Sequence, residues 1–131
     1  MSAGERVLAA ARQLVGVRFR AQGRDPAWGL DCVGLVAVAL ARAGARVTVP
    51  HDCAQACGRC AFDPPDDWRP CAGDRPGDVL LCRVSAAQLH LAVRSADGIV
   101  HADAQARRVV ARPGAVPWPI EQAWRWTPQG D

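Results

Sequence analysis

The chain contains no asparagine and no tyrosine, and all 16 of its basic residues are arginines. Without asparagine, a Cys-His-Asn catalytic triad is excluded, so a residue that orients a catalytic histidine would have to be His, Gln, Asp or Glu. Without tyrosine, no phenol can assist at an oxyanion. The arginines are scattered from Arg6 to Arg125 and the net charge is only +3. We therefore expect no nucleic-acid partner.

Long apolar runs are missing as well. The longest, Val33–Leu40, is much too short to span a bilayer, which takes about 20 apolar residues. The first residues, Met1–Glu5, have neither the basic nor the apolar part of a secretory signal. We expect no membrane partner and a chain that is cytoplasmic as synthesised. With 131 residues, half of them apolar, the chain should form a single domain over residues 1–131.

Two helices are predicted in the first third of the chain. A capping box at Ser2–Glu5 and apolar residues at helical spacing predict a helix over Ala3–Val15. The next segment, 17–29, carries glycine, proline and arginine without periodicity and is predicted to be a loop. A second helix is expected over Asp31–Ala43, with the aspartate at its N-cap and Gly44 at its end.

From Gly77 onward the hydrophobic pattern has a period of two, which predicts strands. The expected strands are Asp78–Val84, Ala87–Arg94, Gly98–Ala102, Arg107–Arg112 and Ala123–Thr127. Helices first and strands afterwards indicate an α+β fold, with the helices packed on one side of an antiparallel sheet of about five strands. Residues 45–77 are rich in proline and cysteine, and we expect irregular structure there with one short helix near residues 51–60.

Cys32 lies at the start of the second predicted helix. Because the thiolate is the nucleophilic form of cysteine, the unpaired N–H groups and the dipole at a helix start favour reactivity there. Gly29 and Gly34 would let backbone and substrate approach closely, and the N–H of Cys32 could donate to a developing oxyanion. This interpretation requires a sulfur that reaches solvent and an imidazole near it. The alternative is a small buried cysteine on an apolar helix.

Two histidines follow on a predicted hairpin. His90 lies on the strand face opposite the Leu-Val face, where the small Ala92 leaves room for a helix. If residues 95–98 form a four-residue loop, His101 lies across from Ala92 and the two imidazoles are diagonal neighbours; a two-residue turn would separate them. In the first case His90 would act as general base and then acid, and His101 would hold its ring in the useful tautomer. The alternative for each is a polar residue at a sheet edge.

These motifs resemble the NlpC/P60 family of cell-wall cysteine peptidases. The run Asp31–Leu35 matches the family's D-C-x-G-L motif, and Gly77–Leu81 looks like its G-D-[LV]-[LV] strand. His90–Val93 looks like its H-[VL]-[GA]-[IV] strand, and Val100–Ala102 like its [IV]-H-A segment. The stretch Phe19–Pro26 before the cysteine is similar to the corresponding stretch in the phage-tail and gene-transfer-agent branch. The match covers nearly the whole chain.

The resemblance implies a papain-like α+β fold and hydrolysis of amide bonds in the peptide stems of peptidoglycan. When the family's roles are transferred to the matching positions, Cys32 is the nucleophile, His90 is the base and His101 is the third member of the catalytic triad. Phage-tail or gene-transfer-agent components are further implied partners, and a phage-like particle or lysis would deliver the chain to the cell wall. The alternative within the same fold is an inactive structural component of a phage-type tail.

The resemblance also implies substrate-binding residues, namely Phe19, Asp31 and Gly34. Two positions depart from the family pattern. The serine that usually follows the cysteine is Val33 here, and Phe19 stands where many members place a tyrosine near the oxyanion. Both departures concern stabilisation of the transition state.

A cysteine cluster is the main competing signal, consisting of Cys53, Cys57, Cys60 and Cys71 with His51 just before it. Such spacing could hold Zn²⁺, and the first three cysteines have the spacing of some iron–sulfur enzymes. The large barrel of those enzymes does not fit in 131 residues. Disulfides are a third option in a released enzyme. We expect unliganded thiols with no metal and no cofactor, and a zinc-stabilised binding module is the alternative.

Three tryptophans and two aspartates near the predicted sheet are further candidates for a structural or functional role. Trp118, Trp124 and Trp126 are expected to pack at the end of the sheet, with the alternative that one of them lines a substrate groove. Asp74 and Asp78 are expected to shape a turn rather than to do chemistry.

Overall fold

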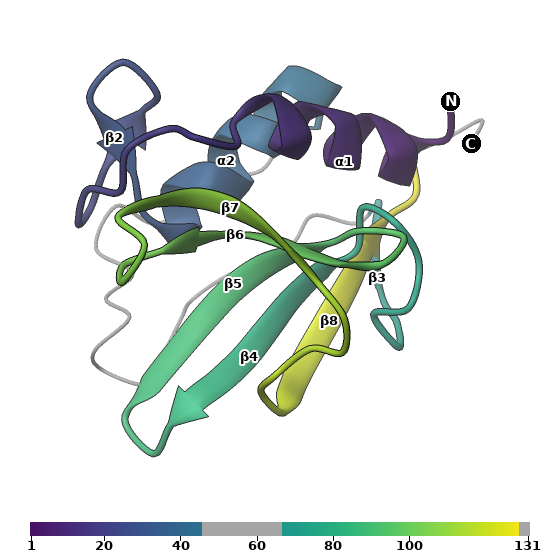
Figure 1. The fold of residues 1–131 in the computed structure, drawn as a ribbon. Coiled ribbons are helices and arrows are strands. Elements are labelled where there is room, and N and C mark those ends of the chain that lie inside the picture. The colour runs from purple at the N-terminus through teal and green to yellow at the C-terminus, as the bar shows by residue number, and fades with distance from the viewer. Residues whose placement is uncertain (46–66, 129–131) are drawn as a thin grey trace.

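The computed structural model describes residues 1–45 and 67–128 of the chain. Their helices and strands are α1 (Ala3–Gln13), β1 (Arg24–Asp25), β2 (Gly29–Leu30), α2 (Cys32–Ala43), β3 (Trp68–Pro70), β4 (Val79–Ser85), β5 (Gln88–Arg94), β6 (Gly98–Asp103), β7 (Arg108–Pro113) and β8 (Ile120–Trp126). Both helices lie over one side of a six-stranded sheet (Figure 1). The strand order is β3-β8-β4-β5-β6-β7, and neighbouring strands are antiparallel. The predicted α+β fold is confirmed, with one strand more than expected.

α1 begins where the capping box predicts. The hydroxyl of Ser2 accepts a hydrogen bond from the N–H of Glu5 at 3.1 Å, which satisfies one of the free donors of the first turn. The helix ends at Gln13, two residues earlier than predicted. Leu14 caps it, and Gly16 follows with a φ of +94°, which turns the chain away from the helix axis.

α2 occupies the predicted range. Asp31 is its N-cap, and Gly44 ends it in the left-handed conformation with a φ of +98°. Most of its side chains are buried, because the helix packs against α1, the sheet and the short β1–β2 hairpin. Neither this helix nor any other within residues 1–45 and 67–128 is long and apolar enough to cross a membrane.

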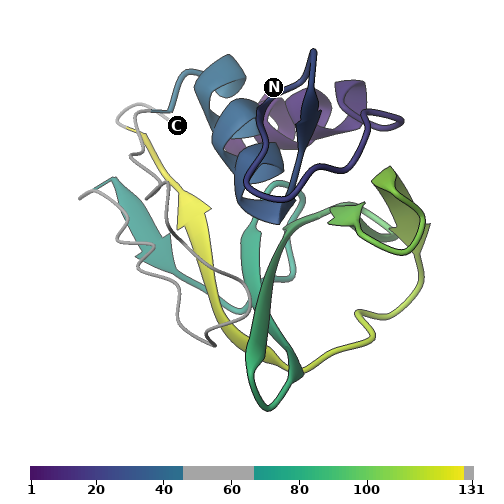
Figure 2. The ribbon, with the colours of Figure 1, turned by 90° about the vertical axis from the view of Figure 1, so that its left-hand side faces the viewer.

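The sheet is covered on both faces. One face packs against the helices and carries, among others, Val79, Leu91 and Val100. The other face carries a second apolar cluster that includes Leu80, Cys82, Ala92, Ile99 and Ala123, packed against Trp118. The expectation that a helix passes beside Ala92 is therefore wrong. The larger apolar area of the Leu-Val face draws the helices to that side, and the segment joining β7 to β8 runs along the other side (Figure 2).

The predicted loop 17–29 contains short pairing. β1 and β2 form a two-stranded hairpin, and isolated bridges join Arg18 to Arg108 and Phe19 to Leu30. These pairs are too short for a period-two pattern, which is why the sequence shows none. The bridge from Arg18 to Arg108 fastens the lead-in, residues 18–30, to the sheet, and the other pairs hold the lead-in together.

Some of the other predictions about the sheet are confirmed and some are wrong. Trp126 stacks on Trp68 with ring centroids 6.5 Å apart, and Trp124 is buried, so packing at the sheet end is confirmed for these two predicted tryptophans. β8 begins at Ile120, earlier than predicted, and β3 was not predicted at all. The short helix expected near residues 51–60 lies outside the described residues.

Asp78 shapes a turn as predicted and also anchors an ion pair. One of its carboxylate oxygens accepts the N–H of Arg75 at 3.0 Å, which closes the turn. The same buried carboxylate accepts two hydrogen bonds from the guanidinium of Arg125, at 2.9 and 2.8 Å, and these raise the pKa of Arg125. Asp74 adds a longer contact to Arg125 at 3.3 Å. The two carboxylates therefore hold β8 against the start of β4.

Candidate active site

The β5–β6 hairpin has the register that brings the two histidines together. Arg94 pairs with Ile99 and Val93 with Val100, so four residues, 95–98, lie between the last paired positions of the hairpin. The N–H of Ser95 closes it on the carbonyl of Gly98 at 2.9 Å. The four-residue loop is thus confirmed, and continuing its register places His101 across from Ala92.

The imidazoles of His90 and His101 are hydrogen-bonded to each other. Nε2 of His90 lies 2.9 Å from Nδ1 of His101, and the rings are almost perpendicular, at 89°. The backbone pairing of β5 with β6 covers only the two residue pairs next to the loop. Beyond them the strands diverge (Figure 1), and the imidazole contact is the link between them at this level.

Both imidazoles are buried, and burial sets their charge. His90 is 8% exposed and His101 is 3% exposed. Burial lowers the pKa of His90 to about 4, helped by His101 and opposed by the carboxylate of Asp103. Burial also lowers the pKa of His101, where Asp103 opposes the shift and Arg112 adds to it. The pair is therefore neutral at pH 7, which suits a general base rather than a resting imidazolium.

Trp118 lies against both histidines. Its ring centroid is 5.2 Å from that of His90 and 5.5 Å from that of His101, edge to face in each case. The three rings line a cavity of about 430 Å³ whose other lining residues include Gln88, Asp103 and Arg112. The alternative interpretation, in which one tryptophan lines a groove, therefore describes Trp118. No sequence pattern marked Arg112, because the β6–β7 pairing brings it to the histidines. Asp103 follows His101 by two residues on β6, so strand alternation places it on the same face, a signal that the sequence analysis missed.

Asp31 organises the start of α2. One of its carboxylate oxygens accepts the N–H of Gly34 at 2.8 Å and the guanidinium of Arg24 at 2.7 Å. The other accepts the N–H of Gln22 at 3.0 Å. These three donors come from α2 and from the lead-in, so the carboxylate ties the two segments together. The structure therefore places Asp31 as a buried cap that positions the helix carrying Cys32.

Gly34 lies where the lead-in crosses the helix. A Cβ on residue 34 would lie 2.0 Å from the carbonyl oxygen of Gly23, so only glycine permits this contact. Phe19 is half-buried and packs against the core cluster of the helices. Its N–H donates to the carbonyl of Arg107 at 2.9 Å. Both predicted substrate-binding residues thus fasten the lead-in in this structure.

Cys32 is the first residue of α2, as predicted, but it is only 1% exposed. The expectation of a solvent-accessible sulfur is not met, because the lead-in, the helices and the sheet enclose the start of α2. Cys32 belongs to the core cluster on the helix side, whereas His90 pairs with Cys82, a member of the second cluster. The structure brings the two histidines together, and the cysteine is buried in the core cluster of the helices.

The other cysteines of the described segments have raised pKa values. Burial raises the pKa of the Cys71 thiol and raises that of Cys82 to about 11. No group of three or more potential ligands (His, Cys, Asp, Glu) is placed to hold a metal ion within residues 1–45 and 67–128. Cys53, Cys57 and Cys60 of the predicted cluster lie outside these residues.

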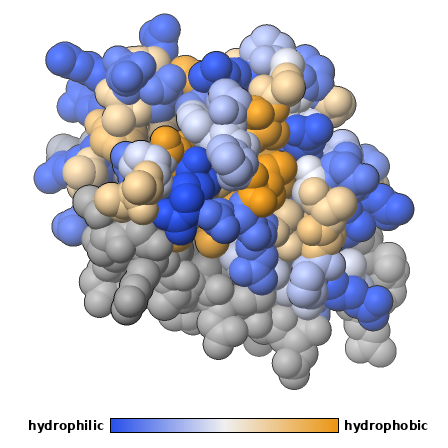
Figure 3. Space-filling model, turned by 90° about the horizontal axis from the view of Figure 1, so that it is seen from below, coloured by the Kyte–Doolittle hydropathy of each residue, from blue (hydrophilic) through white to orange (hydrophobic). Residues whose placement is uncertain are grey.

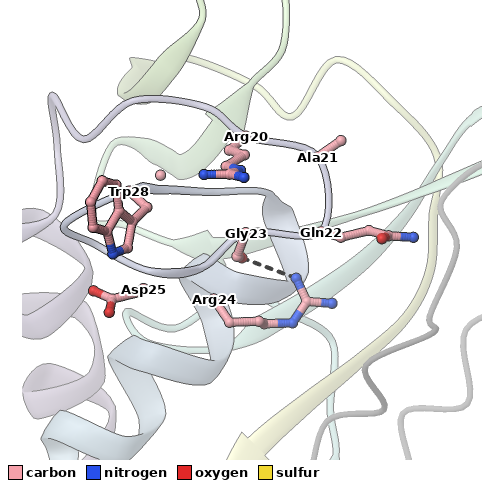
Figure 4. Close-up of a pocket in the computed structure, with 8 residues that line it drawn as sticks. Arg20, Ala21, Gln22, Gly23, Arg24, Asp25 and Trp28 are labelled. Atoms are coloured by element: carbon pink, nitrogen blue, oxygen red, sulfur yellow. Dashed lines mark hydrogen bonds between the residues drawn. The ribbon is translucent and has the colours of Figure 1, made fainter.

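A second cavity, of about 370 Å³, lies within the lead-in. Arg20, Gln22 and Trp28 line it together with Arg24, whose guanidinium donates to the carbonyl of Gly23 at 3.0 Å (Figure 4). Trp28 is 67% exposed, which is unusual for so large an apolar side chain. The sequence could have drawn notice to Trp28, because it is a large aromatic residue in a loop of polar residues and glycine.

Comparison with solved structures assigns the architecture. NlpC1 of Trichomonas vaginalis matches over 95% of this chain and 44% of its own length, with a TM-score of 0.67 and 21% identity. The NlpC/p60 domain of the peptidoglycan hydrolase SagA matches over 84% and 88%, with a TM-score of 0.57 and 23% identity. The peptidoglycan hydrolase RipB of Mycobacterium tuberculosis matches over 96% and 65%, with a TM-score of 0.63 and 23% identity.

The chain has the NlpC/P60 fold. It spans less than half the length of NlpC1, at 44%, so the match concerns one part of that protein. No protein-family model and no curated protein sequence matches the chain. At 19–23% identity the likeness is one of fold, and the NlpC/P60 fold was predicted from four short motifs in the right order.

Proposed function

We propose that this NlpC/P60-fold chain is a cysteine peptidase that hydrolyses amide bonds in the peptide stems of peptidoglycan. Cys32 is the nucleophile, His90 the general base and then acid, and His101 the residue that orients His90. The observation that carries the proposal is the 2.9 Å hydrogen bond between the two buried imidazoles. It supports the proposal because it engages Nε2 of His90 and leaves Nδ1 as the nitrogen that can take a proton.

The reaction follows from that assignment. Nδ1 of His90 takes the proton of the Cys32 thiol, and the sulfur attacks the carbonyl carbon of the scissile amide. The backbone N–H of Cys32 donates to the resulting oxyanion. The proton on Nδ1 then passes to the leaving amine as the C–N bond breaks. A water molecule, deprotonated by Nδ1, attacks the thioester, and the sulfur leaves with the proton as the acid is released.

In this proposal the thiol and the imidazole meet where α2 packs against the strands that carry the histidines. α2 packs against both β5 and β6, and these strands diverge beyond the loop at the level of the histidines. A small outward movement of the lead-in would expose the sulfur of Cys32 at this opening. In this proposal Asp31 and Gly34 position the start of α2, and Phe19 packs beside the oxyanion without the hydroxyl of the family's tyrosine.

The test is digestion of purified sacculi, with mass analysis of the released fragments. The unmodified chain should release stem peptides cut at a single type of amide bond. Cys32→Ala and Cys32→Ser should lower the rate at least about 10³-fold, since the nucleophile is lost. Cys71→Ala is the matched control, because Cys71 lies outside the proposed site, and it should keep the activity. Equal activity of the Cys32 variants and the unmodified chain contradicts the proposal.

A second candidate is an inactive component of a phage-type tail with the same fold. The observation that favours it is the 1% exposure of Cys32. It predicts no release of fragments by any variant and co-purification with tail or gene-transfer-agent proteins. For the peptidase, we propose synthesis in the cytoplasm and delivery to the cell wall by such a particle or by lysis.

A further inference from the structure

We propose that the cavity beside the histidine pair is a carboxylate-binding subsite formed by Arg112, His101 and the face of Trp118. It deepens the proposed function, because it identifies the feature by which a substrate would be held next to His90. The binding of a carboxylate there can nevertheless be measured without any hydrolysis.

The first argument concerns Nε2 of His101. His101 is 3% exposed, and within the described part of the chain its Nε2 has no hydrogen-bond partner. If His90 uses Nδ1 as the base, its Nε2 carries a hydrogen and donates to Nδ1 of His101. Nε2 of His101 then carries a hydrogen as well. A buried N–H donor without an acceptor is costly, and a ligand acceptor in the cavity would remove that cost.

The second argument concerns Arg112. Its guanidinium carbon lies 5.9 Å from the centroid of Trp118, so the ring supports it from one side. Arg112 forms no ion pair with any residue in the segments 1–45 and 67–128, and it lines the same cavity as His101. A guanidinium stacked on an aromatic face keeps its N–H edge available, and that edge matches a carboxylate in geometry.

The third argument concerns the carboxylate already present. Asp103 also lines the cavity, and one of its oxygens accepts the N–H groups of Gln105 at 2.9 Å and Ala106 at 3.2 Å. These bonds hold Asp103 in its own turn rather than on Arg112. The cavity thus has a free cation and a buried N–H donor close together. A peptide carboxylate can accept hydrogen bonds from both of these donors, whereas an ammonium group can accept from neither.

The cavity combines apolar and polar walls. Seen from the side of the sheet opposite the helices, hydrophilic residues border an apolar strip (Figure 3). On this side of the sheet the cavity has the ring of Trp118 as an apolar wall and Gln88 as a further polar group. A short peptide with a terminal or side-chain carboxylate has the matching combination of groups.

The test uses two probes that differ in one group. N-acetylalanine is a carboxylate at pH 7, and N-acetylalaninamide is its neutral counterpart of the same shape. Each is titrated into the full chain while the imidazole signals of the histidines are followed by NMR. We expect saturable shifts of the His90 and His101 signals with the carboxylate, and binding of the amide weaker by about tenfold or more.

Variants of the cavity arginine complete the test. Arg112→Gln should remove the preference for the carboxylate, and Arg112→Lys should keep part of it. The control is Arg108→Gln, which removes an exposed arginine from the same strand but outside the cavity and should bind as the unmodified chain does. Equal binding of both probes by the unmodified chain overturns the proposal even if a variant fails to fold. Unchanged preference in a folded Arg112→Gln overturns it as well.

The experiments can contradict the subsite proposal and the peptidase proposal independently of each other. If hydrolysis depends on Cys32 but both probes bind equally, the peptidase proposal stands and the subsite proposal is contradicted. If carboxylate binding depends on Arg112 but the chain cuts no stem peptide, the subsite proposal stands and the proposed function is contradicted.

Discussion

Nδ1 of His101 lies 2.9 Å from Nε2 of His90, although 11 positions separate the two residues in the chain. This single contact engages one nitrogen on each ring and leaves the other for different partners. On His90 the remaining nitrogen, Nδ1, is the one that the proposed mechanism uses as the base. On His101 it is a buried nitrogen without a hydrogen-bond partner among the described residues, in a ring that lines the same cavity as Arg112 and Trp118.

Replacing His101 tests this division of roles. His101→Ala should lower kcat for stem-peptide hydrolysis by about 10²- to 10⁴-fold, because His90 loses the partner that selects its tautomer. His101→Gln can still accept from Nε2 of His90 and should recover part of the loss. The measurement is kcat and KM with one soluble stem peptide, and similar kcat values for both variants would count against an orienting role.

The buried histidines should make stability depend on pH. The pKa of His90 is about 4 in the folded chain and near 6.5 when unfolded, so the unfolded state binds more protons between these values. Stability is therefore complete above about pH 6.5 and is lost as the pH falls toward 4. Between pH 7 and pH 5 we expect a loss of about 2 kcal/mol from His90, with a further loss of the same sign from His101.

Thermal or urea unfolding across this pH range measures the effect. A folded His90→Gln variant should show a flatter profile between pH 7 and pH 5, because only the contribution of His101 remains. A profile as steep as that of the unmodified chain would mean that other groups cause the pH dependence.

Asp31→Ala should destabilise the chain by about 1 to 3 kcal/mol. The substitution removes the N-cap of α2 and leaves the donors of Gln22 and Arg24 without this acceptor. The matched control is Asp25→Ala, in the β1–β2 hairpin just before Asp31, where the carboxylate is exposed and accepts one local bond from Ala27. Urea unfolding should show a smaller loss of unfolding free energy for the control. Equal losses in the two variants would contradict a special role of Asp31.

Gly34→Ala should destabilise the chain by more than about 1 kcal/mol. In an open helix interior, alanine in place of glycine stabilises by roughly that amount, so the predicted sign is the reverse of the usual one. The cause is the carbonyl oxygen of Gly23, which a Cβ would approach to 2.0 Å. A stabilised variant in urea unfolding would show that the lead-in can move away from α2 at little cost.

Alkylation separates the two candidate functions. Burial raises the pKa values of Cys71 and Cys82, so neither of these thiols should react quickly with iodoacetamide at pH 6 to 7. For a peptidase, Cys32 should react fastest despite its burial, because opening of the lead-in exposes an activated thiol. For an inactive component, the half-buried Cys71 should react before Cys32. Peptide mapping of partly labelled protein distinguishes the two outcomes.

Local signals in the sequence predicted much of the fold. The serine and aspartate caps placed the starts of α1 and α2, and the four-residue loop before Ile99, one of two alternatives that the sequence left open, brings His101 beside His90. These features depend on hydrogen bonds and periodicity among neighbours in the chain, which is why they can be read without a structure.

Long-range packing decided what the sequence could not. The helices cover the Leu-Val face, the start of α2 is closed by the lead-in, and Trp118 and Arg112 come to the histidines from later segments. The amino-acid sequence by itself determined which residues can do chemistry and where helices and hairpins begin. The tertiary structure decided which of those residues meet and which are buried, because the choice of face and cover depends on the total apolar area that all elements bury together.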